Sequence, residues 1–149
     1  MLPPWSVLDT VQAIVGAGIP VCGHLGLLPQ RASMSGGSRV QGLMADQARQ
    51  ILDDARRLED AGAFMIVVEC IPDRLGALLS RTVRVPIIGI GAGGDCDGQV
   101  LVLHDILGIK SGFQPKFVKR FAEIGDEIAR AAGSFREEVV SGTFPGPDH

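Results

Sequence analysis

Three short, largely apolar runs separated by amphipathic stretches constrain the fold of this chain more than any other feature. The runs cover residues 19–24, 64–69 and 85–90. Runs of this length and character are typical of strands that are covered on both faces, as in parallel sheets. Because apolar residues between the runs recur at helical spacing, the sequence predicts strands that alternate with helices in a parallel sheet.

Five helices are predicted around these strands. The helix after the first strand has Asp46 near its start and Gly62 where a C-terminal cap belongs. A short helix follows with Pro72 near its first turn, and another covers about residues 100–107. Residues 117–121 form either a last short strand or the start of the final helix. A long polar, Gly-rich loop is predicted after the first strand, at residues 25–44. Apolar stripes mark the first helix, at residues 7–15, and the last helix, at residues 121–139.

This pattern amounts to about four βα units in a single predicted domain over residues 1–149. A closed (β/α)8 barrel needs about 250 residues, so the chain would supply roughly half of one. A doubly wound open sheet is the structural alternative. The pattern alone does not separate the two.

Composition and charge narrow the functional classes. Hydrophobic residues make up 46% and charged residues 21% of the chain, as is usual for a soluble globular protein. The net charge of −3 does not indicate the basic surface that nucleic-acid binding requires. The sequence contains neither an apolar run long enough to span a bilayer nor a signal peptide at its start. The cysteines, Cys22, Cys70 and Cys96, are odd in number and widely spaced, which favours neither a disulfide framework nor a zinc site. We therefore expect a cytoplasmic protein.

Candidate catalytic residues lie where the predicted strands end, because reacting groups gather there in parallel α/β folds. Glu69 directly follows the apolar residues 65–68. A carboxylate at that position loses hydration and takes up a proton more readily, which suits a general base. The alternative is a structural glutamate paired with an arginine or capping a helix. His24 also ends a strand and could hydrogen-bond a substrate or orient another group, or be purely structural; His104, within a helical pattern, is interpreted as structural.

Two further patterns are weaker. Residues 89–94 read GIGAGG, but the glycine spacing fails the dinucleotide-binding pattern, so a tight turn or a close approach of the backbone to a ligand explains them better. Asp97 is interpreted as a helix N-cap before Gly98, and the pair Asp53–Asp54, near two arginines, as part of a solvated helix face. No metal ligand is assigned, although Mg²⁺ needs only one or two carboxylates.

From about Trp5 to His149, the chain resembles the C-terminal half of ketopantoate hydroxymethyltransferases. Several separate motifs carry this resemblance, and they occur in the order found in the family. They are VCGHLGLLPQ, GGSRVQG, the stretch from ADQARQ to VVECIP, the GIGAGGDCDGQVLVLHDILG segment, PKFVKRF and the ending SGTFPGPDH, at residues 21–30, 36–42, 45–72, 89–108, 115–121 and 141–149.

The resemblance implies a (β/α)8 barrel that assembles into large homo-oligomers. It implies transfer of a hydroxymethyl group from 5,10-methylenetetrahydrofolate to the small oxo acid 3-methyl-2-oxobutanoate, with Mg²⁺ polarising the carbonyl of that acid. Glu69 matches the family glutamate that removes the proton from the carbon next to this carbonyl. His24 matches a family active-site histidine.

Some family features are absent. The aspartates that bind Mg²⁺ and the lysine that holds the oxo acid belong to the N-terminal half of the barrel, which this chain lacks. Leu28, Ser38 and Arg39 stand where the family commonly has Thr, an aromatic residue and Lys. One hypothesis is that the chain is half of a transferase, encoded by a truncated or split gene. The others are an inert remnant or module that docks onto a full-length subunit, and, by fold analogy alone, another barrel lyase acting on oxo acids. We expect no turnover by the isolated chain, and self-association or pairing with another barrel half.

Overall fold

A computed structural model of the chain describes residues 6–28, 39–109, 112 and 114–149. The chain divides into two compact units, one ending at Val100 and one beginning at Leu101, and each is described by itself. None of the described helices is long and apolar enough to cross a membrane. Ser38 and half of the loop predicted over residues 25–44 lie outside the described residues.

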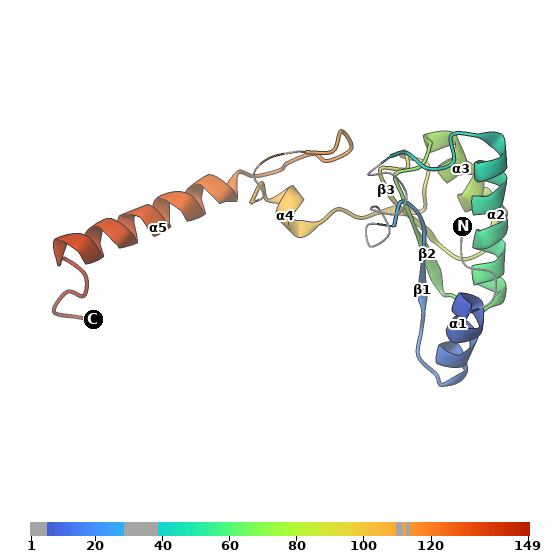
Figure 1. Ribbon diagram of the computed structural model, residues 1–149, viewed down its shortest axis with the longest axis horizontal. Helices are drawn as coiled ribbons and strands as arrows, with labels where there is room; N and C mark the ends of the chain where they lie inside the picture. The colour runs from blue at the N-terminus through green and yellow to red at the C-terminus, as the bar shows by residue number, and fades with distance from the viewer. Residues whose placement is uncertain (1–5, 29–38, 110–111, 113) are drawn as a thin grey trace. The chain divides into compact units, whose positions relative to one another are not determined.

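The first unit is a four-stranded parallel sheet with helices packed against it (Figure 1). Each strand pairs with the next strand along the chain, in the order β1-β2-β3-β4. The strands are β1 (Cys22–Gly26), β2 (Met65–Glu69), β3 (Ile87–Ile90) and β4 (Gly98–Gln99). The helices are α1 (Ser6–Gly16), α2 (Ala45–Asp60) and α3 (Asp73–Thr82).

The strand order separates the two architectures that the sequence left open. A doubly wound sheet reverses its strand order at a switch point, so its helices cover both faces. Here the order never reverses, and right-handed crossovers then place successive helices on one face. Figure 1 shows α2 and α3 on the same side of the sheet. The fold is therefore α/β with four parallel strands, consistent with a partial (β/α)8 barrel, as predicted.

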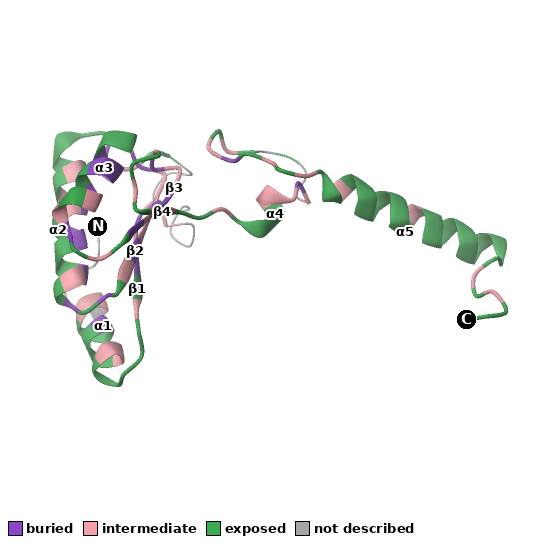
Figure 2. Cartoon of the chain, turned by 180° about the vertical axis from the view of Figure 1, so that it is seen from behind, coloured by how far each residue is buried: buried purple, intermediate pink, exposed green. Residues whose placement is uncertain are grey.

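The core of this unit lies between the sheet and its helices (Figure 2). Along β2, Ile66 and Val68 are fully buried, whereas Met65, Val67 and Glu69 are only half-buried. Side chains alternate between the faces of a strand, so the half-buried set shares the face that a closed barrel would turn inward. The helix-facing side chains pack with Ile51, Ala55, Leu58, Leu75 and Leu79.

Several predicted boundaries differ from those observed. The first strand begins at Cys22 rather than at residue 19. The helix predicted over about residues 100–107 is reduced to α4 (Leu103–Ile106), and residues 117–121 form neither strand nor helix. The two-residue strand β4 was not predicted, because two residues carry no periodicity.

The predicted N-cap at Asp97 is wrong. A strand rather than a helix follows this residue. Its carboxylate instead accepts a hydrogen bond of 2.8 Å from the backbone N–H of Ile87, and so fixes the loop before β4 to the start of β3.

The second unit contains α4 and the long helix α5 (Ile124–Ser141), which confirms the predicted final helix. Gly142 follows α5 directly and adopts a left-handed backbone conformation typical of the residue that caps a helix end. The apolar stripe of α5 stays exposed among the described residues, with exposed fractions from 38% to 56% at Ile124, Ile128, Phe135 and Val139. The ring of Phe135 packs edge-on against Phe144, with 5.4 Å between the ring centroids.

Candidate functional site

The two site residues predicted from the sequence lie together. His24 is aligned with Val67, and Gly26 with Glu69, so both site residues point to the half-buried face of the sheet. The Nε2 atom of His24 lies 3.1 Å from Oε2 of Glu69, although this approach falls outside hydrogen-bond geometry. The Glu69 side chain is 15% exposed and that of His24 33%. A partly dehydrated carboxylate beside an imidazole is a suitable proton acceptor, and its role as a base stays a prediction.

Backbone hydrogen bonds hold the end of β2 from both sides. The carbonyl of Glu69 accepts a bond of 2.8 Å from the N–H of Leu27, and the N–H of Cys70 donates to Ile90 at 2.9 Å. The carbonyl of Cys70 accepts from the N–H of Gln41, also at 2.9 Å. The chain segments after β1 and at the end of β3 therefore both fix the backbone that carries Glu69.

Cys70 has the one positive φ angle, 52°, found at a non-glycine position among the described residues. A left-handed conformation costs a residue with a side chain about 1–3 kcal/mol and persists where surrounding contacts impose it. The hydrogen bonds on both sides of Cys70 are such contacts. Nothing in the sequence signals this conformation, because cysteine is not a residue that favours it.

Two glycines let the backbone pass close to neighbouring segments, one at Glu69 and one at the start of α3. Gly26 has a φ of 88°, and a Cβ atom there would collide with the carbonyl oxygen of Glu69. Gly93 has a φ of 85°, and a Cβ atom there would meet Asp73 at the start of α3. The GIGAGG segment thus provides a turn, one of the two interpretations made from its spacing, and the close approach observed at Gly93 is to a helix.

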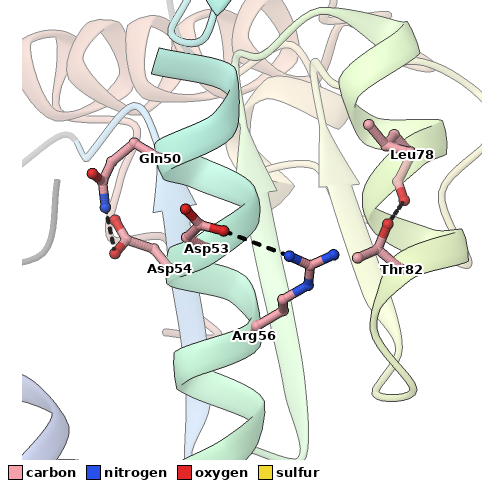
Figure 3. Close-up of polar contacts among 6 residues, drawn as sticks. All are labelled: Gln50, Asp53, Asp54, Arg56, Leu78 and Thr82. Carbon is pink, nitrogen blue, oxygen red and sulfur yellow. Dashed lines mark hydrogen bonds and ion pairs between the residues drawn. The ribbon is translucent and has the colours of Figure 1, made fainter. Parts of the chain in front are cut away.

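The predicted solvated face at Asp53–Asp54 is wrong for one of the two residues. The Asp53 side chain is 54% exposed, whereas that of Asp54 is 1% exposed. Figure 3 shows the two carboxylates on different sides of α2. The carboxylate of Asp54 accepts a bond of 3.0 Å from Nε2 of Gln50, and Nη1 of Arg57 lies 3.5 Å away. A signal for its burial was present, since Asp54 shares the helical stripe of Ile51, Ala55 and Leu58.

A cavity of about 280 Å³ lies between β1 and α2, and Asp54 is part of its wall. It is lined by His24, Leu25, Gly26, Leu28, Gln41, Gly42, Asp46, Gln47, Gln50, Ile51 and Asp54. The imidazole that contacts Glu69 thus belongs to a residue that also borders this cavity.

No metal centre is formed by the residues described. Among them, no group of three or more His, Cys, Asp or Glu side chains is placed to hold a metal ion. Asp97 is bonded to the backbone, Asp105 belongs to the second unit, and the three cysteines are free. The described residues therefore do not fit a Mg²⁺ site by themselves. His104, interpreted as structural, is exposed on α4.

The Cys70 thiol gives a readout of the Glu69 charge. Burial, and next the negative charge of Glu69, raise the pKa of this thiol. Because the thiolate is the reactive form, a raised pKa slows alkylation at a given pH. We expect Glu69→Gln to speed alkylation of Cys70 by iodoacetamide at pH 8, while burial keeps the rate below that of the exposed Cys22. Mass spectrometry of the modified peptides measures both rates, and an unchanged Cys70 rate would contradict a charged Glu69 beside it.

Comparison with known proteins places this site in a family. Residues 4–147 match the family model described as ketopantoate hydroxymethyltransferase. A 3-methyl-2-oxobutanoate hydroxymethyltransferase of Syntrophobacter fumaroxidans is 52% identical over 143 residues, which are 96% of this chain and 51% of that protein. Proteins of the same name from Cenarchaeum symbiosum and Heliobacterium modesticaldum are 50% and 53% identical, over 97% and 94% of this chain and 55% and 51% of their own lengths.

The chain thus spans about half the length of these curated relatives. The match nevertheless covers almost all of this chain, including both strand ends that carry His24 and Glu69. The chain belongs to the ketopantoate hydroxymethyltransferase family.

Proposed function

We propose that this chain is the proton-abstracting half of an enzyme that transfers a hydroxymethyl group from 5,10-methylenetetrahydrofolate to 3-methyl-2-oxobutanoate, giving ketopantoate for pantothenate synthesis. The observation that supports the proposal most directly is the contact of 3.1 Å between His24 and Glu69 on the inward-facing side of the sheet. The names of the relatives supply the reaction and the oxo acid.

The proposed role of Glu69 is to accept the proton from the carbon next to the carbonyl group of the oxo acid. The electron pair of that C–H bond then forms an enolate, whose carbon attacks the methylene carbon of the folate. Both carbon–nitrogen bonds of that methylene group break in the course of the transfer, a water molecule supplies the hydroxyl oxygen, and tetrahydrofolate leaves. His24, next to the carboxylate, orients it or donates a hydrogen bond to the oxo acid. An enolate also needs positive charge or hydrogen-bond donors at its oxygen. Mg²⁺ serves this purpose in the family, and its ligands would come from another part of the barrel.

The second candidate is a chain without activity that docks onto a full-length subunit. Two observations favour it. The chain matches 51% to 55% of the length of these relatives, and its described sheet has an unpaired strand edge on each side. Under both candidates we expect no ketopantoate from the isolated chain with Mg²⁺ and both substrates. The activity of a completed barrel separates them.

A chimera supplies the positive arm of this test. In it, the unmatched part of the Syntrophobacter fumaroxidans relative is joined ahead of this chain, and we call the product the fused protein. We expect turnover by the fused protein, because it brings a complete barrel together with Glu69 and His24. A folded fused protein without turnover would favour the second candidate.

The isolated chain is also expected to self-associate. β1 and β4 each pair on one side only in the described sheet, and such edges accept strands from other chains. The exposed apolar stripe of α5 adds to this tendency. Sedimentation velocity at several concentrations should show species larger than 15.7 kDa. A single monomeric species up to about 100 μM would contradict the expectation, because association that weak stabilises the complex by less than roughly 5.5 kcal/mol.

A further inference from the structure

The backbone of Cys70 changes direction immediately after the proposed base. Its N–H donates to the carbonyl of Ile90 in β3. In an extended strand, the N–H and C=O groups of one residue point toward the same neighbouring strand. With a φ of 52°, the Cys70 carbonyl instead accepts a bond of 2.9 Å from the N–H of Gln41, in the part of the chain that follows β1. The left-handed conformation therefore ends β2 at Glu69 and bonds the strand end to two different segments.

The segment that donates this bond, residues 39–42, is itself fixed in place, and we call it the anchor segment. Nε2 of Gln41 donates a bond of 2.8 Å to a backbone carbonyl within the segment. Gly42 is buried with a φ of 78°. A Cβ atom there would lie 2.7 Å from the Leu75 side chain and 3.1 Å from that of Ile51. The anchor segment therefore connects the end of β2 to the helices α2 and α3.

The peptide group that joins Glu69 to Cys70 is bonded on both sides. Its carbonyl accepts a bond of 2.8 Å from the N–H of Leu27, and its N–H donates to Ile90 at 2.9 Å. The orientation of this peptide group sets the direction in which the Glu69 side chain leaves the sheet, and Oε2 then lies 3.1 Å from Nε2 of His24. Such placement matters, because an error of about 1 Å at a reacting group can cost about 10²-fold in rate.

We propose that Cys70 is a positioning residue for the proposed base: its left-handed backbone, bonded to the anchor segment, holds the carboxylate of Glu69 beside His24. The inference rests on the proposed function, because it takes Glu69 as the proton acceptor. It assigns the role to the backbone conformation of residue 70 and not to the thiol. Residues that are unbranched at Cβ, and glycine above all, should therefore serve at this position, whereas β-branched residues should not.

Amide hydrogen exchange of the isolated chain measures this contact without any activity. Cys70→Val places a β-branched side chain in the left-handed region, so the carbonyl of residue 70 should turn away and release the N–H of Gln41. We expect that amide to exchange at least about tenfold faster. Cys70→Gly and Cys70→Ala should leave its exchange rate within about threefold. Cys22→Val is the matched control, because Cys22 begins the extended strand β1, and it should not affect the Gln41 amide.

In the fused protein the same variants separate positioning from stability. Cys70→Val should lower kcat at least about tenfold and change KM by less than about threefold, because a displaced carboxylate slows proton transfer more than binding. The primary isotope effect should rise when the oxo acid carries deuterium on the carbon that loses the proton, because proton transfer then limits the rate. Cys70→Gly and Cys70→Ala should keep kcat within about threefold of the unchanged fused protein.

Gly42→Ala reaches the same contact from the anchor segment, and it decides the inference even if Cys70→Val does not fold. A Cβ atom at a φ of 78° strains the segment. The Gln41 amide should therefore exchange faster, and kcat should fall at least about threefold. Gly16→Ala is its control, because a Cβ atom there meets nothing within 4 Å.

Two results would overturn the inference. One is an unchanged exchange rate of the Gln41 amide, or an unchanged kcat, in Cys70→Val or in Gly42→Ala. The other is a loss of kcat in Cys70→Ala as large as that in Cys70→Val, which would assign the role to the thiol. A fused protein without turnover, in a chain that shows the expected exchange pattern, would refute only the proposed function.

Discussion

Glu69→Gln in the fused protein is expected to lower ketopantoate formation by about 10²–10⁴-fold, the usual contribution of a general base. The amide keeps the size of the side chain but cannot accept the proton from carbon. The loss should appear in kcat, because the proton is transferred in the transition state and not on binding. Steady-state assays with saturating folate and a varied oxo acid concentration separate kcat from KM.

The control for this variant is Glu59→Gln, the same chemical change at the end of α2. Glu59 accepts hydrogen bonds from the backbone N–H and Nε of Arg84, and it lies outside the inward-facing set of side chains. Its side chain is only 13% exposed, so the change should lower stability by weakening the bonds to Arg84. It should leave kcat within a factor of about three, because Glu59 does not contact the reacting groups. Exchange of the substrate's C–H hydrogen with deuterated water, followed by NMR, isolates the proton transfer itself. Exchange that persists in Glu69→Gln would assign the base to another residue.

The sequence predicted those parts of the fold that depend on apolar patterning. The run at residues 64–69 predicts a strand because its residues before Glu69 are continuously apolar, and both faces of that strand are indeed buried or half-buried. Glu69 stands out as a candidate because it ends this run. Asp54 was misinterpreted because adjacent arginines outweighed its position in the apolar stripe. Charge pairs on a helix usually indicate a face exposed to solvent, but here Asp54, one member of the pair with Arg57, is buried.

Features set by tertiary contacts could not be predicted. The strand β4 exists because Gly98 and Gln99 align with Ile88 and Gly89, a pairing that has no local signature. The left-handed conformation of Cys70 results from bonds to Gln41 and Ile90, which are distant in sequence. His24 and Glu69 were predicted as separate strand-end residues, and their contact was not predicted, because it depends on the register in which β1 pairs with β2.

Substitutions on the two faces of β2 should respond differently when the barrel halves are joined. Ile66 is fully buried against the helices, so Ile66→Ala should lower the free energy of unfolding of the isolated chain by about 2–5 kcal/mol. Val67 lies on the other face and is half-buried, so Val67→Ala should cost the isolated chain under ~1 kcal/mol. Urea denaturation followed by circular dichroism measures both changes.

In the fused protein the same two substitutions test whether the sheet closes. Inward-facing side chains of a complete barrel pack in layers, so Val67 would become buried and its loss should then cost about 1.5 kcal/mol or more. The cost of Ile66→Ala should not change, because its environment between sheet and helices is already complete in this chain. An unchanged, small cost of Val67→Ala would mean that the inward face stays open to water. Glu69 would then keep only the partial dehydration that it has in this chain, where its side chain is 15% exposed, and the added half would contribute nothing to the desolvation of the proposed base.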